Sequence, residues 1–170
     1  MLYHGADVIK DPRRHVSATG QSYRNQKAGS MAKQETLHAS AVALNGKGVL
    51  ILGRSGAGKS SLALEMMAYG CQLIADDRVL VWRENGKIIA DAPAALSGLI
   101  EARGVGLLNA SPAGPTRITL ICDLDQSNDA RLPPAQVYDL MDIAISLVTG
   151  PLRPHLGMAL RQYLLAGRRH

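Results

Sequence analysis

The residues whose spacing most clearly indicates chemistry lie in a glycine-rich segment before the middle of the chain. The sequence GRSGAGKS matches G-x-x-x-x-G-K-[S/T] at every defined position. Glycines let backbone N–H groups turn toward phosphate oxygens, and a following helix directs the positive end of its dipole at the same oxygens. In such a loop the lysine reaches the β- and γ-phosphates, and the serine hydroxyl binds Mg²⁺. The predicted nucleotide-binding residues are Gly53, Arg54, Ser55, Gly56, Ala57, Gly58, Lys59, Ser60 and Ser61.

Two adjacent carboxylates, Asp76 and Asp77, end the apolar segment that follows the loop's helix. Ligands of open α/β sheets bind outside the carboxyl ends of the strands, so we expect both aspartates near the phosphates. One is predicted to bind Mg²⁺, directly or through water, and the other to take a proton from an incoming hydroxyl. The alternative is that the DDR segment is a polar turn that caps the next element.

Two other places carry charged or titratable groups within apolar sequence. Glu101 and Arg103 lie in LIEARGVGLLN together with Gly104 and Gly106, a pattern that predicts a shaped, partly buried loop. A salt bridge at a helix end is the alternative. His38 precedes Gly53 by fifteen residues and is placed on a strand beside the loop's own strand. From residue type alone, a structural histidine is the more common case.

Apolar runs predict the strands and helices that must position these side chains. An Asn-Gly turn between two such runs predicts a hairpin whose second strand leads into the glycine loop. Residues 92–110 mix helical, loop and glycine signals. Helices are predicted over residues 59–69, and residues 135–147 and 155–167 are predicted to be helical or mixed. The two strands of the hairpin cover residues 36–44 and 49–53. Further strands are predicted over residues 71–75, 79–82, 87–90 and 117–125. The sum is an α/β domain with a mixed, strand-rich sheet and flanking helices.

Composition limits the class of protein. The 170 residues are 46% apolar, enough for one domain with its own core. The net charge is +5, and residues 1–36 carry six Lys/Arg against three Asp/Glu, so the remainder is near neutral. We therefore predict a disordered basic segment over residues 1–35, a folded domain over residues 36–170, and no nucleic-acid partner.

The sequence has neither a secretory signal nor an apolar run of about 20 residues, which predicts a cytoplasmic protein without a membrane segment. Cys71 and Cys122 lie in apolar runs and are predicted to be reduced core residues.

Taken in order, these motifs resemble one family, the bacterial HPr kinase/phosphorylase. The similarity runs from about His38 to Leu165 and rests on His38, GRSGAGKS, LIADDRV and LIEARGVGLLN. The resemblance implies a single P-loop kinase domain like the catalytic domain of that family. It implies that the chain uses ATP or pyrophosphate to phosphorylate a serine of HPr, the small carrier protein of the phosphotransferase system. It also implies the reverse reaction, in which inorganic phosphate attacks the phosphoserine and pyrophosphate leaves.

The resemblance further implies roles for individual residues. The predicted catalytic residues are His38, Lys59, Asp76, Asp77 and Arg153. The predicted magnesium ligands are Ser60, Asp76 and Glu101. Glu101, Arg103, Gly104 and Gly106 belong to the segment linked to both reaction directions. Arg153, in GPLRP, is the candidate for the family's catalytic arginine, and Arg131 is the alternative. Full-length members carry a further N-terminal domain, and members often form homo-oligomers such as hexamers.

Two other interpretations stay open at this point. A small-molecule P-loop kinase is disfavoured because such folds begin with the loop's strand and usually carry an arginine-rich lid. Here a hairpin comes first, and no arginine-rich run lies between residues 100 and 135. A nucleotide- or phosphate-binding sensor with little turnover is disfavoured because a pure binder has no need of His38, Asp76 and Asp77. Phosphoryl transfer to a protein serine would distinguish the main interpretation from both.

Overall fold

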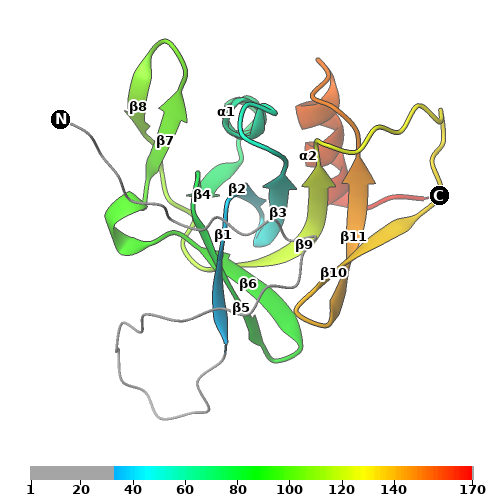
Figure 1. Ribbon diagram of the computed structural model, residues 1–170, viewed down its shortest axis with the longest axis horizontal. Coiled ribbons are helices and arrows are strands. Elements are labelled where there is room, and N and C mark those ends of the chain that lie inside the picture. Colours follow the sequence, from blue (N-terminus) through cyan, green and yellow to red (C-terminus); the bar gives the residue numbers. More distant parts are fainter. Residues whose placement is uncertain (1–32, 170) are drawn as a thin grey trace.

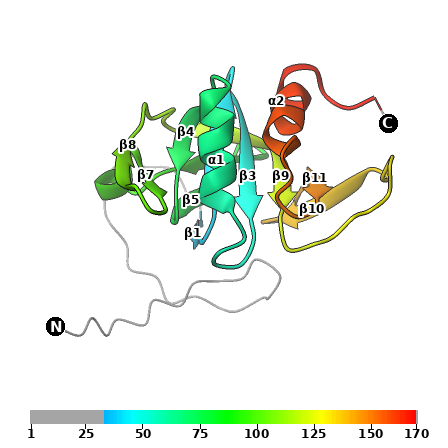
Figure 2. The ribbon, with the colours of Figure 1, turned by 90° about the horizontal axis from the view of Figure 1, so that it is seen from above.

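In the computed structural model, a curled sheet carries two helices on one of its faces, and residues 33–169 are described (Figures 1 and 2). A second, two-stranded sheet projects beside the first. The helices are α1 (Lys59–Ala68) and α2 (Leu156–Ala166), with a 3₁₀ turn η1 (Ala94–Leu96). The strands are β1 (Gln34–Leu37), β2 (Ser40–Leu44), β3 (Lys47–Leu52), β4 (Gln72–Ala75), β5 (Val79–Glu84), β6 (Lys87–Asp91), β7 (Leu99–Ala102), β8 (Gly106–Asn109), β9 (Thr116–Asp123), β10 (Gln136–Leu140) and β11 (Ile143–Thr149).

The main sheet is mixed, as the sequence predicts, and forks at β9. Its order is β1-β5-β6-β9-β3-β2-β4, with the β10–β11 hairpin joined to β9 through β11. β3 and β11 run parallel to β9, while β2 runs antiparallel to both β3 and β4. Four strands, β3, β4, β9 and β11, therefore point the same way. Their carboxyl ends meet at one edge of the sheet, which lies at the top of Figure 1. We call this the carboxyl edge.

The core lies on both faces of the central strand β3. Val49 and Ile51 pack with Leu62 of α1 in the cluster beneath the helices. Leu50 and Leu52, which point the other way, pack in the cluster enclosed by the curl of the sheet. Successive side chains of a strand point to opposite faces, so a strand that is apolar throughout is buried on both. Each fully buried Leu or Ile contributes roughly 1.5–3 kcal/mol, which makes β3 a rigid support for the loop that follows it.

Two predicted hairpins are confirmed. β2 and β3 pair across Asn45–Gly46, and β5 and β6 pair across Asn85–Gly86. Both residues of each turn have positive φ, between 48° and 73°. Asn-Gly is the pair best suited to that backbone conformation, which is why the sequence alone predicts these turns.

Three segments differ from the prediction. Residues 36–44 are not one strand: β1 pairs with β5, β2 pairs with β3 and β4, and the chain bends at residues 38–39 where it changes neighbours. Residues 135–147, predicted helical or mixed, form the β10–β11 hairpin, because their Val, Ile and Tyr residues pack on a pleated surface. Residues 92–110 form η1 and the separate β7–β8 sheet. The helix predicted over residues 155–167 is confirmed as α2.

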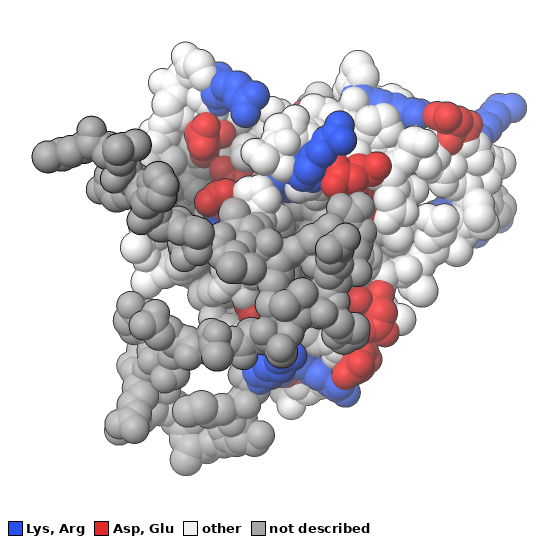
Figure 3. All heavy atoms as spheres, in the orientation of Figure 1, with Lys and Arg blue, Asp and Glu red and all other residues white. Residues whose placement is uncertain are grey.

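The N-terminal prediction falls mostly outside the described residues. Residues 1–32 of the predicted basic segment are not described, and β1 begins at Gln34, two residues before the predicted boundary. Within residues 33–169, no helix has the length and apolar character needed to span a bilayer. On the face shown in Figure 3, Lys and Arg side chains lie close to Asp and Glu side chains, both at the top of the view near the carboxyl edge and at the opposite, lower end.

Candidate active site

The glycine loop connects β3 to α1 at the carboxyl edge. Gly58 has φ +98°, and a Cβ atom there would lie 2.7 Å from Leu152 Cδ2, so glycine fits the position best. No side chain caps α1. The N–H groups of the first turn of a helix have no partner within the helix, so they remain free to bind an anion. The loop thus has a left-handed glycine at the start of an uncapped helix, and its binding of phosphate stays a prediction.

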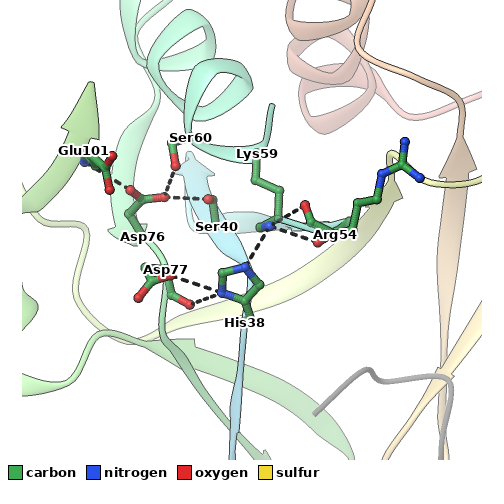
Figure 4. Close-up of polar contacts among 9 residues, drawn as sticks. His38, Ser40, Arg54, Lys59, Ser60, Asp76, Asp77 and Glu101 are labelled. Atoms are coloured by element: carbon green, nitrogen blue, oxygen red, sulfur yellow. Dashed lines mark hydrogen bonds and ion pairs between the residues drawn. The ribbon is translucent and has the colours of Figure 1, made fainter. Parts of the chain in front are cut away.

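Lys59 is the central cation of the site, although only 7% of it is exposed. Its Nζ donates to the carbonyl oxygens of Gly53 at 2.9 Å and Arg54 at 3.0 Å, and contacts His38 Nε2 at 3.1 Å (Figure 4). Burial lowers the pKa of Lys59 below its usual value, and the nearby carboxylates of Asp77, Asp125 and Asp76 oppose that shift. An ammonium group only donates, so these three contacts use all of its N–H groups.

His38 joins Lys59 to Asp77. Because Nε2 accepts from Lys59, we assign the ring proton to Nδ1. Nδ1 lies 3.2 Å from the backbone oxygen of Asp77 and 3.1 Å from its Oδ1. His38 lies in the bend between β1 and β2 rather than within a strand, which corrects its predicted position. The bend turns the imidazole toward the carboxyl edge.

The two adjacent aspartates point in different directions. Asp77 has φ +64°, a left-handed conformation that Asp tolerates better than most residues, and 63% of its side chain is exposed. Asp76 is only 6% exposed. Its Oδ1 accepts hydrogen bonds from Ser40 Oγ at 2.6 Å and Ser60 Oγ at 2.8 Å, and its Oδ2 accepts one from the backbone N–H of Glu101 at 3.1 Å. The Asp76 carboxylate therefore faces Ser60 and Glu101, whereas Asp77 faces His38 (Figure 4).

Most of the predicted site residues line one open hollow at this edge. Glu101 on β7 and Arg103 in the following turn form one wall, so the predicted loop is a hairpin, with Gly104 in its turn and Gly106 at the start of β8. Asp76 lies directly behind the surface. The lining residues are His38, Ser40, Ser55, Gly56, Gly58, Lys59, Ser60, Ser61, Asp77, Glu101 and Arg103.

Neither candidate arginine is among the described residues that line the hollow. Arg153 follows Leu152, which contacts the loop at Gly58, but its Nη2 lies 3.1 Å from Asp129 Oδ1 in an exposed ion pair. Arg131 is exposed in the segment between β9 and β10. Both therefore lie on segments near the carboxyl edge without reaching the hollow in this conformation.

Two residues of the site were not predicted from the sequence. Ser40, the first residue of β2, is fully buried against Asp76. Asp125 follows β9, the strand next to β3, and its Oδ2 accepts a hydrogen bond of 2.9 Å from the backbone N–H of Arg54 in the glycine loop. Asp125 itself is held by Asp123, whose Oδ1 accepts from its N–H at 3.0 Å. The signal for Asp125 was present, because RITLICDLD is an apolar strand that ends on carboxylates, as LIADD does.

A strand, a glycine loop and a helix meet a pair of aspartates at the carboxyl edge of this sheet, which defines a mixed α/β domain with a candidate site at that edge. The chain belongs to the HPr serine kinase C-terminal domain family, whose model matches residues 29–155. HPr kinase/phosphorylase 1 of Oceanobacillus iheyensis is 30% identical over 168 residues, which cover 91% of this chain and 54% of the relative. HPr kinase/phosphorylase of Latilactobacillus sakei is 34% identical over 145 residues, which cover 78% of this chain and 46% of the relative. The chain spans about half the length of these curated relatives.

A solved structure shares the fold. The HPr(Ser) kinase/phosphatase from Coxiella burnetii matches with a TM-score of 0.67 and 25% sequence identity, over 77% of this chain and 88% of that chain. The family resemblance and the fold class predicted from the sequence are therefore confirmed.

Proposed function

We propose that this chain phosphorylates a serine of an HPr-like phosphocarrier protein, with ATP or pyrophosphate as the donor, and reverses the reaction by phosphorolysis. Membership of the HPr serine kinase C-terminal domain family supports the proposal, as do the names of the relatives. The observation that carries it is the division between the adjacent aspartates. Asp76 faces Ser60 of the glycine loop, whereas Asp77 faces His38 at the open hollow. A magnesium role and a proton-transfer role then fall to different carboxylates.

In this proposal the glycine loop and Lys59 hold the transferred phosphate. The free N–H groups at the start of α1 and the Lys59 ammonium offer donors to its oxygens. All three N–H groups of Lys59 are engaged, so phosphate binding requires that at least one contact be exchanged. The contact with His38 is the one that lies at the hollow, and we expect it to be exchanged first.

The residues near Asp76 fit a magnesium ion. Mg²⁺ prefers oxygen ligands and is usually held by one or two carboxylates together with phosphate oxygens and water. Ser60, Asp76 and Glu101 bring hydroxyl and carboxylate oxygens to one wall of the site. Within residues 33–169, no three His, Cys, Asp or Glu side chains gather closely enough to enclose a metal without other ligands. Bound there, Mg²⁺ would neutralise charge on the phosphates, and these three residues would hold it.

Asp77 is the proposed base. A serine hydroxyl that enters the hollow attacks the terminal phosphorus, its proton passes to the Asp77 carboxylate, and the bond to the leaving ADP breaks. In the reverse direction, an oxygen of inorganic phosphate attacks the phosphoserine phosphorus and gives its proton to Asp77. The bond between that phosphorus and the serine oxygen breaks as Asp77 returns a proton to the serine oxygen, and the pyrophosphate so formed is released. Asp77 suits this role because its side chain is exposed and lines the hollow. The Nδ1–H of His38 keeps the carboxylate in place.

Other parts of the function stay predictions that accompany this proposal. We keep Arg153 as the candidate for the charge-stabilising arginine and Arg131 as the alternative, and either must move toward the hollow to act. Assembly into a homo-oligomer such as a hexamer and a cytoplasmic location are expected from the family resemblance. The proposed partner is the phosphocarrier protein, not a nucleic acid or a membrane.

The test is mass spectrometry of a purified HPr-like protein incubated with this chain, Mg²⁺ and ATP, followed by excess phosphate. A gain of one phosphate on serine, then its loss with release of pyrophosphate, is the expected result. Lys59→Ala should abolish both steps, while Lys87→Ala, an exposed lysine at the start of β6, should leave them unchanged. Nucleotide binding without any phosphoserine would favour the sensor, and transfer to a small molecule instead would favour the small-molecule kinase.

A further inference from the structure

Ser40 is a buried polar residue to which the proposed mechanism gives no role. It is fully buried as the first residue of β2 and lies between two buried alanines, Ala39 and Ala41. Its Oγ–H donates to Asp76 Oδ1 at 2.6 Å. A hydroxyl has a single proton to donate, so the whole donor capacity of Ser40 is spent on that carboxylate.

The register of β2 against β4 explains how Ser40 reaches Asp76. Ala41 pairs with Ala75 in an antiparallel ladder, so the next residue toward the loop on each strand comes opposite the other, which places Ser40 beside Asp76. His38, two residues earlier, contacts Asp77. Within this short segment, His38 therefore contacts Asp77 and Ser40 holds Asp76. Each partner keeps its aspartate aimed at a different side of the site.

The Asp76 carboxylate depends on few donors. Its contacts come from Ser40, Ser60 and the N–H of Glu101, and three neutral donors must replace the water that a buried carboxylate has lost. Ser60 shares Oδ1 with Ser40. Without the Ser40 hydroxyl, only Ser60 would hold Oδ1, so one of the three contacts that fix the orientation of the carboxylate would be lost. The position of Ser60 would then be less well defined.

We propose that Ser40 is a positioning residue for the magnesium side of the site. Its hydroxyl holds Asp76 in the orientation that supports Ser60, and so sets how tightly the chain binds nucleotide with Mg²⁺. The inference rests on the proposed nucleotide and magnesium site, but not on the identity of the protein substrate. Residues that orient metal ligands typically change metal affinity 10- to 100-fold when removed. Because phosphate would share the metal here, we expect the lower end, about tenfold.

The experiment measures binding of a fluorescent ATP analogue to the full chain over a range of Mg²⁺ concentrations, and again with EDTA. Ser40→Ala should raise the half-saturating Mg²⁺ concentration about tenfold and leave metal-free binding unchanged. Ser40→Thr and Ser40→Val form a matched pair, because they have the same shape and only threonine keeps the hydroxyl. The threonine variant should have the half-saturating Mg²⁺ concentration of the unchanged chain, and the valine variant should have the raised concentration of Ser40→Ala.

The melting temperature of each variant is measured alongside, without ligand and with Mg²⁺ and the analogue together. The first value reports stability, and the rise between the two reports binding. Weaker binding of Ser40→Ala with and without Mg²⁺ alike would mean a merely structural role and would overturn the proposal. So would a Mg²⁺ requirement of Ser40→Ala within about twofold of that of the unchanged chain, well below the expected range. Wild-type binding that does not respond to Mg²⁺ would overturn it too. Should the bulkier pair fail to fold, Ser40→Ala alone decides.

These measurements contain no phosphocarrier protein. A chain that fails to phosphorylate such a protein would therefore refute the proposed function and leave the test of Ser40 intact. Conversely, normal transfer to the phosphocarrier with an unchanged Mg²⁺ requirement in Ser40→Ala would refute only the role of Ser40.

Discussion

Replacing each aspartate of the pair by asparagine should separate stability from activity, although the two residues are adjacent in sequence. Asp76 uses both carboxylate oxygens as acceptors, Oδ1 from Ser40 and Ser60 and Oδ2 from the N–H of Glu101. Asparagine offers one acceptor oxygen and one NH₂ group. If its oxygen replaces Oδ1, its NH₂ group faces the Glu101 N–H. That backbone donor cannot rotate away and loses its partner.

The expected cost follows from that mismatch. A donor left without a partner in this part-buried contact costs about 1–3 kcal/mol, and neutralising the carboxylate also weakens the two hydroxyl hydrogen bonds that oppose its desolvation. In a protein of this size, about 1 kcal/mol lowers the melting temperature by about 2–4 °C. Asp76→Asn should therefore melt about 2–12 °C below the wild-type chain.

Asp77→Asn is the matched control. Its side chain is mostly exposed, asparagine tolerates the positive φ of this position, and the amide oxygen still accepts from His38 Nδ1. We expect its stability to stay within about 0.5 kcal/mol of wild type. Its serine-kinase turnover should fall about 10²- to 10⁴-fold with little change in nucleotide binding, because it has lost the proposed base.

The assay is thermal unfolding of the ligand-free proteins by calorimetry, with nucleotide binding and turnover measured on the same samples. The reasoning would be refuted if Asp76→Asn melted within about 1 °C of wild type, below the range expected from one unpaired donor. It would also fail if Asp77→Asn proved the less stable of the two, or kept its full turnover.

The remaining predictions concern the glycine loop and the cysteines. Asp125→Ala removes the acceptor for the N–H of the loop's second residue, so we expect ATP affinity measured by titration calorimetry to fall about five- to tenfold, and an unchanged affinity would contradict this role. Gly58→Ala adds a Cβ atom 2.7 Å from a leucine side chain at positive φ, whereas Gly86→Ala has a similar φ and open space around it. Both should lose about 1–2 kcal/mol of stability from backbone strain, but only Gly58→Ala should lose nucleotide binding in the same titration. Burial raises the pKa of Cys122 to about 12 and also raises the pKa of Cys71. Neither thiol of the native chain should therefore react with a disulfide reagent at pH 8, and both should react once denaturant exposes them. Rapid reaction of the native chain would contradict this prediction.

Several features of this protein were determined by short stretches of sequence. GRSGAGKS predicts the loop because the positive φ at Gly58 favours glycine. The Asn-Gly pairs predict both hairpin turns for the same kind of reason, and the apolar run before Asp76 predicts a strand that ends at the site. In each case neighbouring residues supply the whole signal. The aspartates and Lys59 could therefore be predicted as candidate site residues from short stretches, whereas Glu101 was predicted only through the family resemblance.

Tertiary structure decided how those residues divide their contacts. The partners of a strand lie far away in sequence, so only the folded sheet brings Ser40 to Asp76 and sets Asp125 against the glycine loop. The same cause explains the wrong prediction for residues 135–147, because their pairing with β9 favours strands where local periodicity was ambiguous. The separation of Asp76 from Asp77 depends on one positive φ angle and on which strands lie alongside. Backbone pairing across the sheet, rather than residue type, therefore decides which of two identical neighbours is buried and which is exposed at the hollow.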